Sequence, residues 1–415
     1  MSQVKKKETK TPLLKREISF KRKPKTKLPK AEKPAMTVKP VSVEKKETPL
    51  LKREVSLSHK TTYRELVGLK IGASQLAAAR VDNQGAPKLL QLARQPLPPG
   101  IVSSGEVRDV PALGAALDEF FRANDLPRKG VRLGLATSRI GVRMVEIAGV
   151  EDERQLANAV LFRAHEALSI PVDEAVIDYH VIDENVDESG TVNRRILLVV
   201  AYRESVDRYV AACKQAKIEL MGIDLEAFGL LRAVAAPSSN GAAPAAAVVA
   251  VNVGHDRTTL AVSNGRLCQF TRVLEWGGAK MTAAVVRELR IAPAEAEQLM
   301  LGLTLGADAN GAAAGEDTRR QGAAEAARRE LQALARDLVA SLEFYQGQTD
   351  SLPIAEILLA GGTSRVPGLP EDLERLTRVR VRQADPLARV AVADNLKTGE
   401  DLPSLAIAIG LGVND

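Results

Sequence analysis

The sequence predicts an α/β protein with two lobes that face each other across a cleft, and with a small α/β subdomain inserted in the first lobe. The chain has 415 residues, which is more than a single hydrophobic core usually holds. Segments 66–81 and 248–265 share one layout: a strand, a glycine turn, a short polar run and a second strand. A third segment, 357–369, ends an apolar strand in Gly361-Gly362.

Composition narrows the class of protein. Hydrophobic residues make up 45% of the chain, but no apolar run is long enough to predict a membrane-spanning helix. The first 30 residues lack the apolar core of a signal peptide. The two cysteines, Cys213 and Cys268, suggest neither a disulfide framework nor a metal cluster, and we expect both to be core residues. These features favour a cytoplasmic protein.

Residues 1–60 differ from the rest of the chain. They hold 19 Lys and Arg against 6 Asp and Glu, a net charge of +13, whereas the whole chain carries +6 and the remainder therefore −7. The segment is rich in Lys and Pro and has few aliphatic residues, so it cannot bury enough apolar surface to offset its ordering entropy. We expect it to be disordered in isolation.

Periodicity predicts the elements of the first lobe and its insert. Strands are expected at 66–71, 75–81 and 131–136, and a helix at 110–123. The insert, 138–222, is expected to hold strands at 142–147, 174–182 and 195–201. Leu156, Val160, Ala164 and Leu168 are four apart and predict one helix face. A second helix, 205–217, is expected to bury the stripe formed by Val206, Tyr209, Val210 and Cys213.

The second lobe is predicted to begin after a flexible joint at 236–246. A strand at 247–253 leads into a hairpin with Asn264-Gly265 at its tip. Residues 302–323 are rich in Gly and Ala and predict a loop. The remaining expectations are an amphipathic helix through 331–345, a strand at 357–360 and a small-residue helix at 402–413. The expected boundaries, from tail through first lobe, insert, return helix with linker, second lobe and C-terminal helix, are 1–60, 61–137, 138–222, 223–246, 247–400 and 401–415.

The two glycine turns are the candidate ligand-binding site. A strand that feeds a tight hairpin leaves backbone N–H groups free at the turn, and two such turns that face each other can hold a polyphosphate. Glycine allows a phosphate to approach the backbone closely. The Gly361-Gly362 segment could hold a nucleoside against its backbone.

The order and spacing of these segments resemble the actin-like ATPase superfamily, whose fold is ribonuclease H-like. Within it, residues 63–415 resemble the PilM family of type IV pilus assembly proteins. The most specific points are WGGAKMT (276–282), SLEFY (341–345) and LLAGGTSRVPGL (358–369). The insert resembles a subdomain that PilM shares with the division protein FtsA.

The resemblance implies a nucleotide site, with ATP as the expected ligand and no metal ligands assigned. The residues that match the family's phosphate hairpins and nucleoside loop are Lys70, Gly72, Ala73, Ser74, Asn252, Gly254, His255, Thr258, Gly277, Gly278, Ser341, Gly361, Gly362 and Thr363. His255 is either a phosphate contact or a solvent-facing loop histidine.

The sequence departs from the superfamily where each phosphate hairpin begins. The superfamily has Asp there, which holds Mg²⁺ through water; this chain has Lys70 and Asn252. Three interpretations remain open: Lys70 replaces Mg²⁺ as a point charge, the pocket is empty and structural, or Asp256 compensates. Ala340 stands where the family often has Arg before the helix serine. We therefore expect weak ATP hydrolysis or none, because phosphoryl transfer relies on a metal and a positioned water. No Walker-type loop, serine-hydrolase elbow or zinc motif occurs.

The resemblance implies a cytoplasmic scaffold at the inner membrane that docks a PilN-like protein in a groove of the insert and links it to the pilus assembly ATPases. A homo-oligomer is compatible with this function. The alternatives are an FtsA-like filament protein on the membrane and an ATP-dependent kinase of the same superfamily.

The tail carries one peptide twice, TPLLKREISF (11–20) and TPLLKREVSL (48–57). Phe20 is its only aromatic residue, so single-stranded nucleic acid is not an expected partner. The charge suits either a solvated tail or anionic lipid. The repeated apolar residues favour a docking motif in two copies, bound as a short helix or an added strand. Translation from Met36 would leave one copy.

Overall fold

The computed structural model describes residues 63–150, 152–167, 171–235, 245–265, 267–305, 316–348, 351–394, 396, 399 and 401–414. The chain divides into residues 1–60 and 61–415, and only the second unit is described below. The repeated peptides, Met36, the 236–244 part of the predicted joint and Leu168 lie outside the described residues. Among the described residues, no helix is long and apolar enough to cross a membrane.

The first lobe is built on a six-stranded sheet in the order β10-β6-β1-β2-β3-β16. β1, β2 and β3 form an antiparallel meander, and β6 runs parallel to both β1 and β10. The strands are β1 Glu65–Ile71, β2 Gln75–Asp82, β3 Lys88–Pro96, β6 Val131–Leu135, β10 Leu220–Leu225 and β16 Ala391–Val392. Helices α1 Val110–Ala123 and α3 Arg203–Gln215 pack on this sheet and share its core. A short hairpin, β4 Val102–Ser103 with β5 Glu106–Val107, precedes α1.

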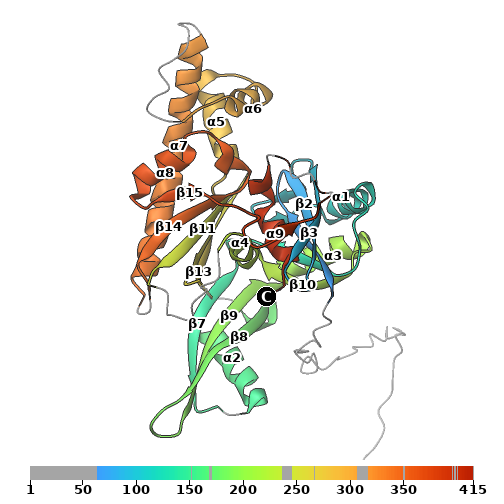
Figure 1. Cartoon of the computed structure of the whole chain (residues 1–415), viewed down its shortest axis with the longest axis vertical. Helices are drawn as coiled ribbons and strands as arrows, with labels where there is room; N and C mark the ends of the chain where they lie inside the picture. The colour runs from blue at the N-terminus through green and yellow to red at the C-terminus, as the bar shows by residue number, and fades with distance from the viewer. Residues whose placement is uncertain are drawn as a thin grey trace, which may run out of the picture. The chain divides into compact units, whose positions relative to one another are not determined.

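The insert lies below the lobes in Figure 1, drawn in green. It is a three-stranded antiparallel sheet in the order β7-β9-β8, covered by one helix. Its elements are β7 Gly141–Ala148, α2 Glu153–Ala167, the 3₁₀ turn Val172–Glu174, β8 Ala175–Val186 and β9 Val192–Tyr202. Leu156, Val160 and Ala164 are buried on one face of α2, against Ile196 and Leu198 of β9.

The second lobe has a five-stranded sheet in the order β13-β12-β11-β14-β15. Its strands are β11 Ala247–Val253, β12 Thr258–Ser263, β13 Cys268–Leu274, β14 Ile354–Ala360 and β15 Val381–Gln383. Its helices are α5 Gly278–Leu289, α6 Pro293–Leu301, α7 Glu316–Gln346 and α8 Leu369–Thr377, with a 3₁₀ turn at Gly362–Arg365. The apolar stripe of α7, from Leu331 to Tyr345, is buried as its spacing predicts.

Two helices lie between the sheets, α4 Glu226–Val234 and α9 Ala406–Gly412 (Figure 1). α9 packs on β1 and β2 of the first lobe, and α4 packs on β11 and β12 of the second. Glycine makes the first of these contacts close, since a Cβ on Gly68 of β1 would lie 2.1 Å from the carbonyl oxygen of Ala408. The helix pair therefore couples the two lobes through one apolar layer.

Several sequence predictions need correction. Residues 316–323, predicted as loop, form the first turns of α7, because Ala323 and the alanines after it are buried in the second-lobe core. The helix predicted at 402–413 starts as a 3₁₀ turn at Leu402–Leu405. The helix predicted at 205–217 spans Arg203–Gln215, since Lys217 adopts a positive φ of 56°. Val210 is 38% exposed and does not belong to the buried stripe.

Candidate functional site

The two predicted hairpins have the same turn. The Gly72 N–H donates to the Gln75 carbonyl oxygen at 2.9 Å, and the Gly254 N–H donates to that of Arg257 at 3.0 Å. A Cβ on Gly254 would lie 2.9 Å from the same Arg257 oxygen, so the turn is too tight for a side chain. The glycine N–H groups are therefore used by the turns themselves, contrary to expectation. Within the described chain, the next two N–H groups of each turn have no acceptor: Ala73, Ser74, His255 and Asp256.

The hairpins and the Gly362 turn line one cleft of about 250 Å³. Nine of the predicted site residues lie there: Lys70, Gly72, Ala73, Ser74, Asn252, Gly254, His255, Gly362 and Thr363. The Thr363 hydroxyl donates to the Gly254 carbonyl oxygen at 2.9 Å and so joins the third segment to the second hairpin. Sequence reasoning did not assign the other lining residues to the site, apart from weighing Asp256 as a compensating acid: Gln75, Glu226, Asp256, Arg257, Arg365, Asp401 and Ser404.

The remaining predicted residues support the cleft from behind or lie away from it. The Thr258 hydroxyl is buried and donates to the Trp276 carbonyl oxygen at 2.7 Å. A Cβ on Gly277 would lie 2.4 Å from the His255 carbonyl oxygen, so this glycine lets α5 approach the hairpin. Gly278 and Gly361 also contact neighbouring backbone. Ser341 is buried on α7, where its hydroxyl donates to the Asp337 carbonyl oxygen, and it does not line the cleft.

Lys70 is the penultimate residue of β1 and lines the cleft. Its side chain is 9% exposed, and it has no hydrogen-bond or ion-pair partner within the described chain. Burial lowers the pKa of the Lys70 ammonium, and the nearby Glu226 carboxylate opposes this shift. Asn252 is the penultimate residue of β11 and lines the cleft from the second lobe, with its side-chain oxygen buried and without a hydrogen-bond partner in the described chain. The first residues of the two hairpins thus present unsatisfied polar groups to the cleft.

An ion pair fills the floor beside Lys70. Arg257 is 5% exposed, and its Nη2 atom lies 3.1 Å from Oε1 of Glu226, which is 1% exposed. The same nitrogen donates to the Ile71 carbonyl oxygen at 3.3 Å. Burial works against the charge of Arg257, but Glu226, Tyr209 and Asp256 together raise its pKa. Asp256 lies 3.5 Å from Arg257 Nη1 and accepts the Ser104 N–H at 2.6 Å.

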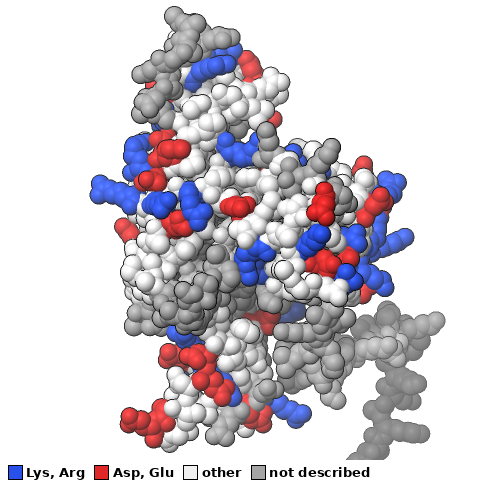
Figure 2. All heavy atoms as spheres, viewed as in Figure 1, with Lys and Arg blue, Asp and Glu red and all other residues white. Residues whose placement is uncertain are grey.

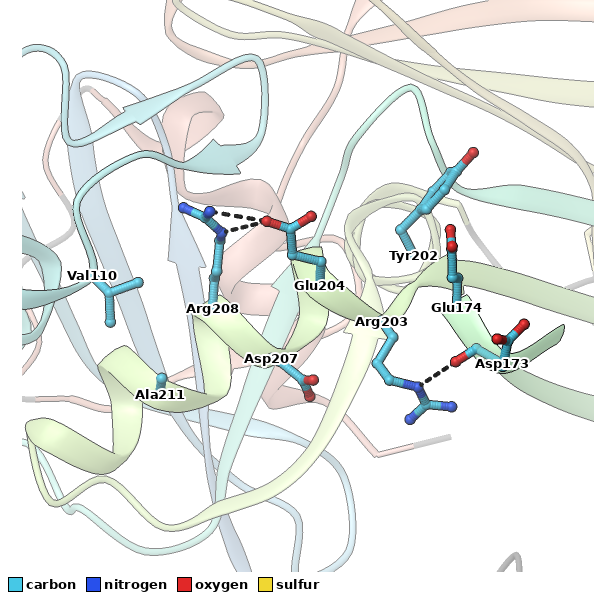
Figure 3. A pocket seen from close by; sticks show the side chains of 9 residues that line it. All are labelled: Val110, Asp173, Glu174, Tyr202, Arg203, Glu204, Asp207, Arg208 and Ala211. Atoms are coloured by element: carbon cyan, nitrogen blue, oxygen red, sulfur yellow. Dashed lines mark hydrogen bonds and ion pairs between the residues drawn. The ribbon is translucent and has the colours of Figure 1, made fainter. Parts of the chain in front are cut away.

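A second, larger hollow of about 620 Å³ lies where the insert meets α1 and α3 (Figure 3). We call it the insert groove, lined by Val110, Asp173, Glu174, Tyr202, Arg203, Glu204, Asp207, Arg208 and Ala211. Figure 3 shows Val110 and Ala211 at one end and Tyr202 with Glu174 at the other.

The insert groove has an uneven charge balance. Arg208 forms an ion pair with Glu204 at 2.9 Å, and Arg203 donates to the carbonyl oxygens of Asp173 and Ala175. Within the described chain, the carboxylates of Asp173, Glu174 and Asp207 have no cationic partner. The groove thus offers unpaired negative charge beside apolar surface.

Comparison with known proteins identifies the family of this chain. The family model for the type IV pilus assembly protein PilM matches residues 68–313, more than half of the chain. This chain belongs to the PilM family. The model for the cell division protein FtsA also matches, over residues 249–410 of the second lobe and α9.

Several solved structures are similar to this chain. The PilM–PilN type IV pilus biogenesis complex matches with a TM-score of 0.69 and 23% identity, over 84% of this chain and 97% of that chain. MreB 5 of Spiroplasma citri bound to AMPPNP gives 0.48 and 11%, over 84% and 94%. EutJ from Carboxydothermus hydrogenoformans gives 0.47 and 14%, over 84% and 89%. The PilM likeness confirms the predicted two-lobed actin-like fold.

Relatedness to actin-like ATPases implies a magnesium-bound nucleotide, and the cleft of this PilM-family chain does not fit one. Its lining carries three cations (Lys70, Arg257 and Arg365) and three carboxylates (Glu226, Asp256 and Asp401), so it offers no net positive charge. Its volume of about 250 Å³ is below the ~300 Å³ at which small-molecule sites begin. No cluster of three potential metal ligands occurs in the described chain. Asp256 is already engaged by Ser104 and Arg257, which argues against its acting as the compensating acid.

Proposed function

We propose that this PilM-family protein is a cytoplasmic scaffold of type IV pilus assembly that docks a PilN-like inner-membrane protein in the insert groove. The observation that carries this proposal is the groove itself, because its lining combines three carboxylates that have no cationic partner in the described chain with an apolar end at Val110 and Ala211. Family membership and the likeness to the PilM–PilN complex support it. The groove is also large enough for several peptide side chains.

The chemistry of the groove suits a short extended peptide that carries a cation next to aliphatic residues. A Lys or Arg of the peptide would pair with Asp173, Glu174 or Asp207. Its aliphatic side chains would cover Val110 and Ala211. A cytoplasmic peptide of a membrane protein that binds here would hold the scaffold at the inner face of the membrane.

Further partners follow from the same proposal. The scaffold would link the docked membrane protein to the pilus assembly ATPases, and residues 1–60 would add attraction to anionic lipid. Self-association into a homo-oligomer would place several grooves around one assembly. No catalytic residue is assigned, and the FtsA match is explained by the shared second lobe and α9.

Capture from native cells tests the docking site. Full-length protein is used to capture the PilN-like protein from detergent extracts, beside an Ala211→Trp variant that fills the apolar end of the groove. The variant should lose most of the PilN-like protein. The matched control is Ala115→Trp, also on an exposed helix position but outside the groove, which should capture as much as the parent.

Two outcomes would contradict the proposal. Equal capture by the Ala211→Trp variant would move the docking site away from the groove. Capture of division proteins with no pilus component would replace the pilus function with an FtsA-like one.

A further inference from the structure

We propose that Arg257 and Glu226 form an internal clasp that ties the two lobes together in the absence of nucleotide, in the place where actin-like ATPases hold a metal-bound nucleotide. This inference starts from the misfit of the cleft to Mg²⁺ and nucleotide. It does not depend on the docking function, which uses the insert groove.

The clasp joins three separate layers of the molecule. Arg257 belongs to the β11–β12 hairpin of the second lobe, and Ile71, whose carbonyl oxygen it contacts at 3.3 Å, ends β1 of the first lobe. Glu226 is the first residue of α4, which lies between the sheets. One guanidinium group therefore bridges the second lobe, the first lobe and the helical layer at the same point. Arginine suits this task because its planar fork donates in several fixed directions.

Two flanking contacts follow the same pattern. The Asp256 carboxylate, next to Arg257, accepts the N–H of Ser104 from the β4–β5 turn of the first lobe at 2.6 Å. Ser104 adopts a positive φ of 51°, an uncommon conformation for a residue other than glycine, and in it the N–H reaches Asp256. At the cleft mouth, Asp401 pairs with Arg94 of β3 and, at 3.0 Å, with Arg365 of the second lobe. The protein's own side chains thus make polar contacts across the cleft, where a bound nucleotide would otherwise make them.

The burial of Glu226 and Arg257 predicts the effect of removing either side chain. Glu226 and Arg257 are both more than nine-tenths buried, so removing one partner leaves the other charge desolvated and unpaired. Removing both partners leaves no such charge, and the double variant should recover much of the loss. Because Arg stays protonated at all accessible pH values, the clasp should hold across the physiological range.

A distance measurement between the lobes tests the clasp. Spin labels are placed at Glu119→Cys on α1 and Glu371→Cys on α8, both exposed, in the full-length chain. Cys213 and Cys268 are buried and should stay unlabelled. We expect one narrow distance distribution that ATP, with or without Mg²⁺, leaves unchanged. Arg257→Ala should broaden it, and Arg257→Lys, which keeps the charge but not the fork, should broaden it less.

The control breaks an Arg–Glu pair inside one lobe. Arg382→Ala removes the two-pronged contact with Glu356 on neighbouring strands of the second lobe, and should leave the inter-lobe distance unchanged. Arg257→Ala should also lower the Tm by roughly 5–10 °C, with partial recovery in Arg257→Ala/Glu226→Ala. Two results would overturn the clasp: a broad parent distribution that narrows on adding Mg²⁺ and ATP, or an Arg257→Lys distribution and Tm identical to the parent.

Discussion

Gly229 of α4 and Gly410 of α9 lie in direct contact where the two helices pack against each other. A Cβ on Gly410 would lie 1.7 Å from the Gly229 carbonyl oxygen, and one on Gly229 would lie 2.9 Å from Cγ of Leu411. The layer between the lobes therefore depends on the absence of side chains at these two positions. Figure 1 shows both helices between the two sheets.

Gly410→Ala should destabilise the protein by at least about 1–3 kcal/mol, because the added methyl group forces the helices apart. Intrinsic propensity alone would give the opposite sign, since Ala is better than Gly in a helix interior by about 1 kcal/mol. Urea unfolding measures the change in free energy. Gly222→Ala is the control, because a Cβ there meets nothing within 4 Å. A Gly410→Ala protein as stable as the parent would show that the crossing is looser than described.

Lys70→Met should raise the free energy of unfolding at pH 7 by about 1–2 kcal/mol, because it removes a buried cation without a partner. The pKa of Lys70 is lowered in the folded state by burial, so the unfolded chain binds more protons between that pKa and 10.5. The free energy of unfolding of the parent should therefore rise with pH in this window. Its difference from that of Lys70→Met should shrink accordingly.

Denaturation at several pH values checks this prediction. Lys129→Met is the control, since Lys129 is 78% exposed and the substitution should change little. If Lys70→Met is less stable than the parent at pH 7, Lys70 makes a favourable interaction within the folded protein. A parent stabilised by phosphate or ATP, with the effect lost in Lys70→Met, would favour Lys70 as a substitute for Mg²⁺.

Both thiols should resist alkylation in the folded protein. Burial raises the pKa of Cys213 and of Cys268 to about 12, so the thiolate fraction at pH 8 is on the order of 10⁻⁴. A chromogenic disulfide should titrate close to zero thiols in native protein and two in denaturant. Fast native labelling of either cysteine would mean that its lobe opens readily.

The repeated tail peptide should act as a docking motif. Leu14→Asp/Leu51→Asp should remove one binding partner from native-cell captures while pilus components bound through the insert groove remain, since only the apolar residues of the repeats are changed. Each single variant should retain part of the binding, because either copy supplies the motif. A captured set identical to that of the parent would leave charge as the only role of the tail. Figure 2 shows acidic side chains on the visible face of the insert, whereas the tail is basic, so partners of the insert and partners of the tail need separate assays.

Local patterns predicted the elements well and the contacts between them poorly. The helix at 110–123 was predicted from its spacing, and in the structure the Asp109 carboxylate caps it by accepting the Ala112 N–H. The strand at 247–253 follows from its apolar run. Residues 316–323 were misassigned because a Gly- and Ala-rich composition reads as a loop, whereas tertiary burial of Ala323 and its neighbours selects the helix.

In the cleft too, residues on one local segment were predicted, and contacts between distant segments were missed. Nine lining residues were predicted from the two hairpins and the Gly361-Gly362 segment. Glu226 and Arg257 were missed because nothing local links a charge that starts one helix to a charge on a hairpin in the other lobe. Ser341 was assigned by resemblance alone, and the structure places it within the second-lobe core.

The position of α9 constrains how the protein is made. β1 is among the first strands to leave the ribosome, but Gly68 of β1 packs against Ala408, far later in the chain. The same helix packs on α4, which in turn covers β11 and β12 of the second lobe. The inner face of the first-lobe sheet therefore stays uncovered during synthesis until residues 406–412 have emerged. The nascent first-lobe sheet is thus left with one apolar face exposed, and this protein should depend more on chaperones that hold nascent chains than a protein whose domains fold in sequence.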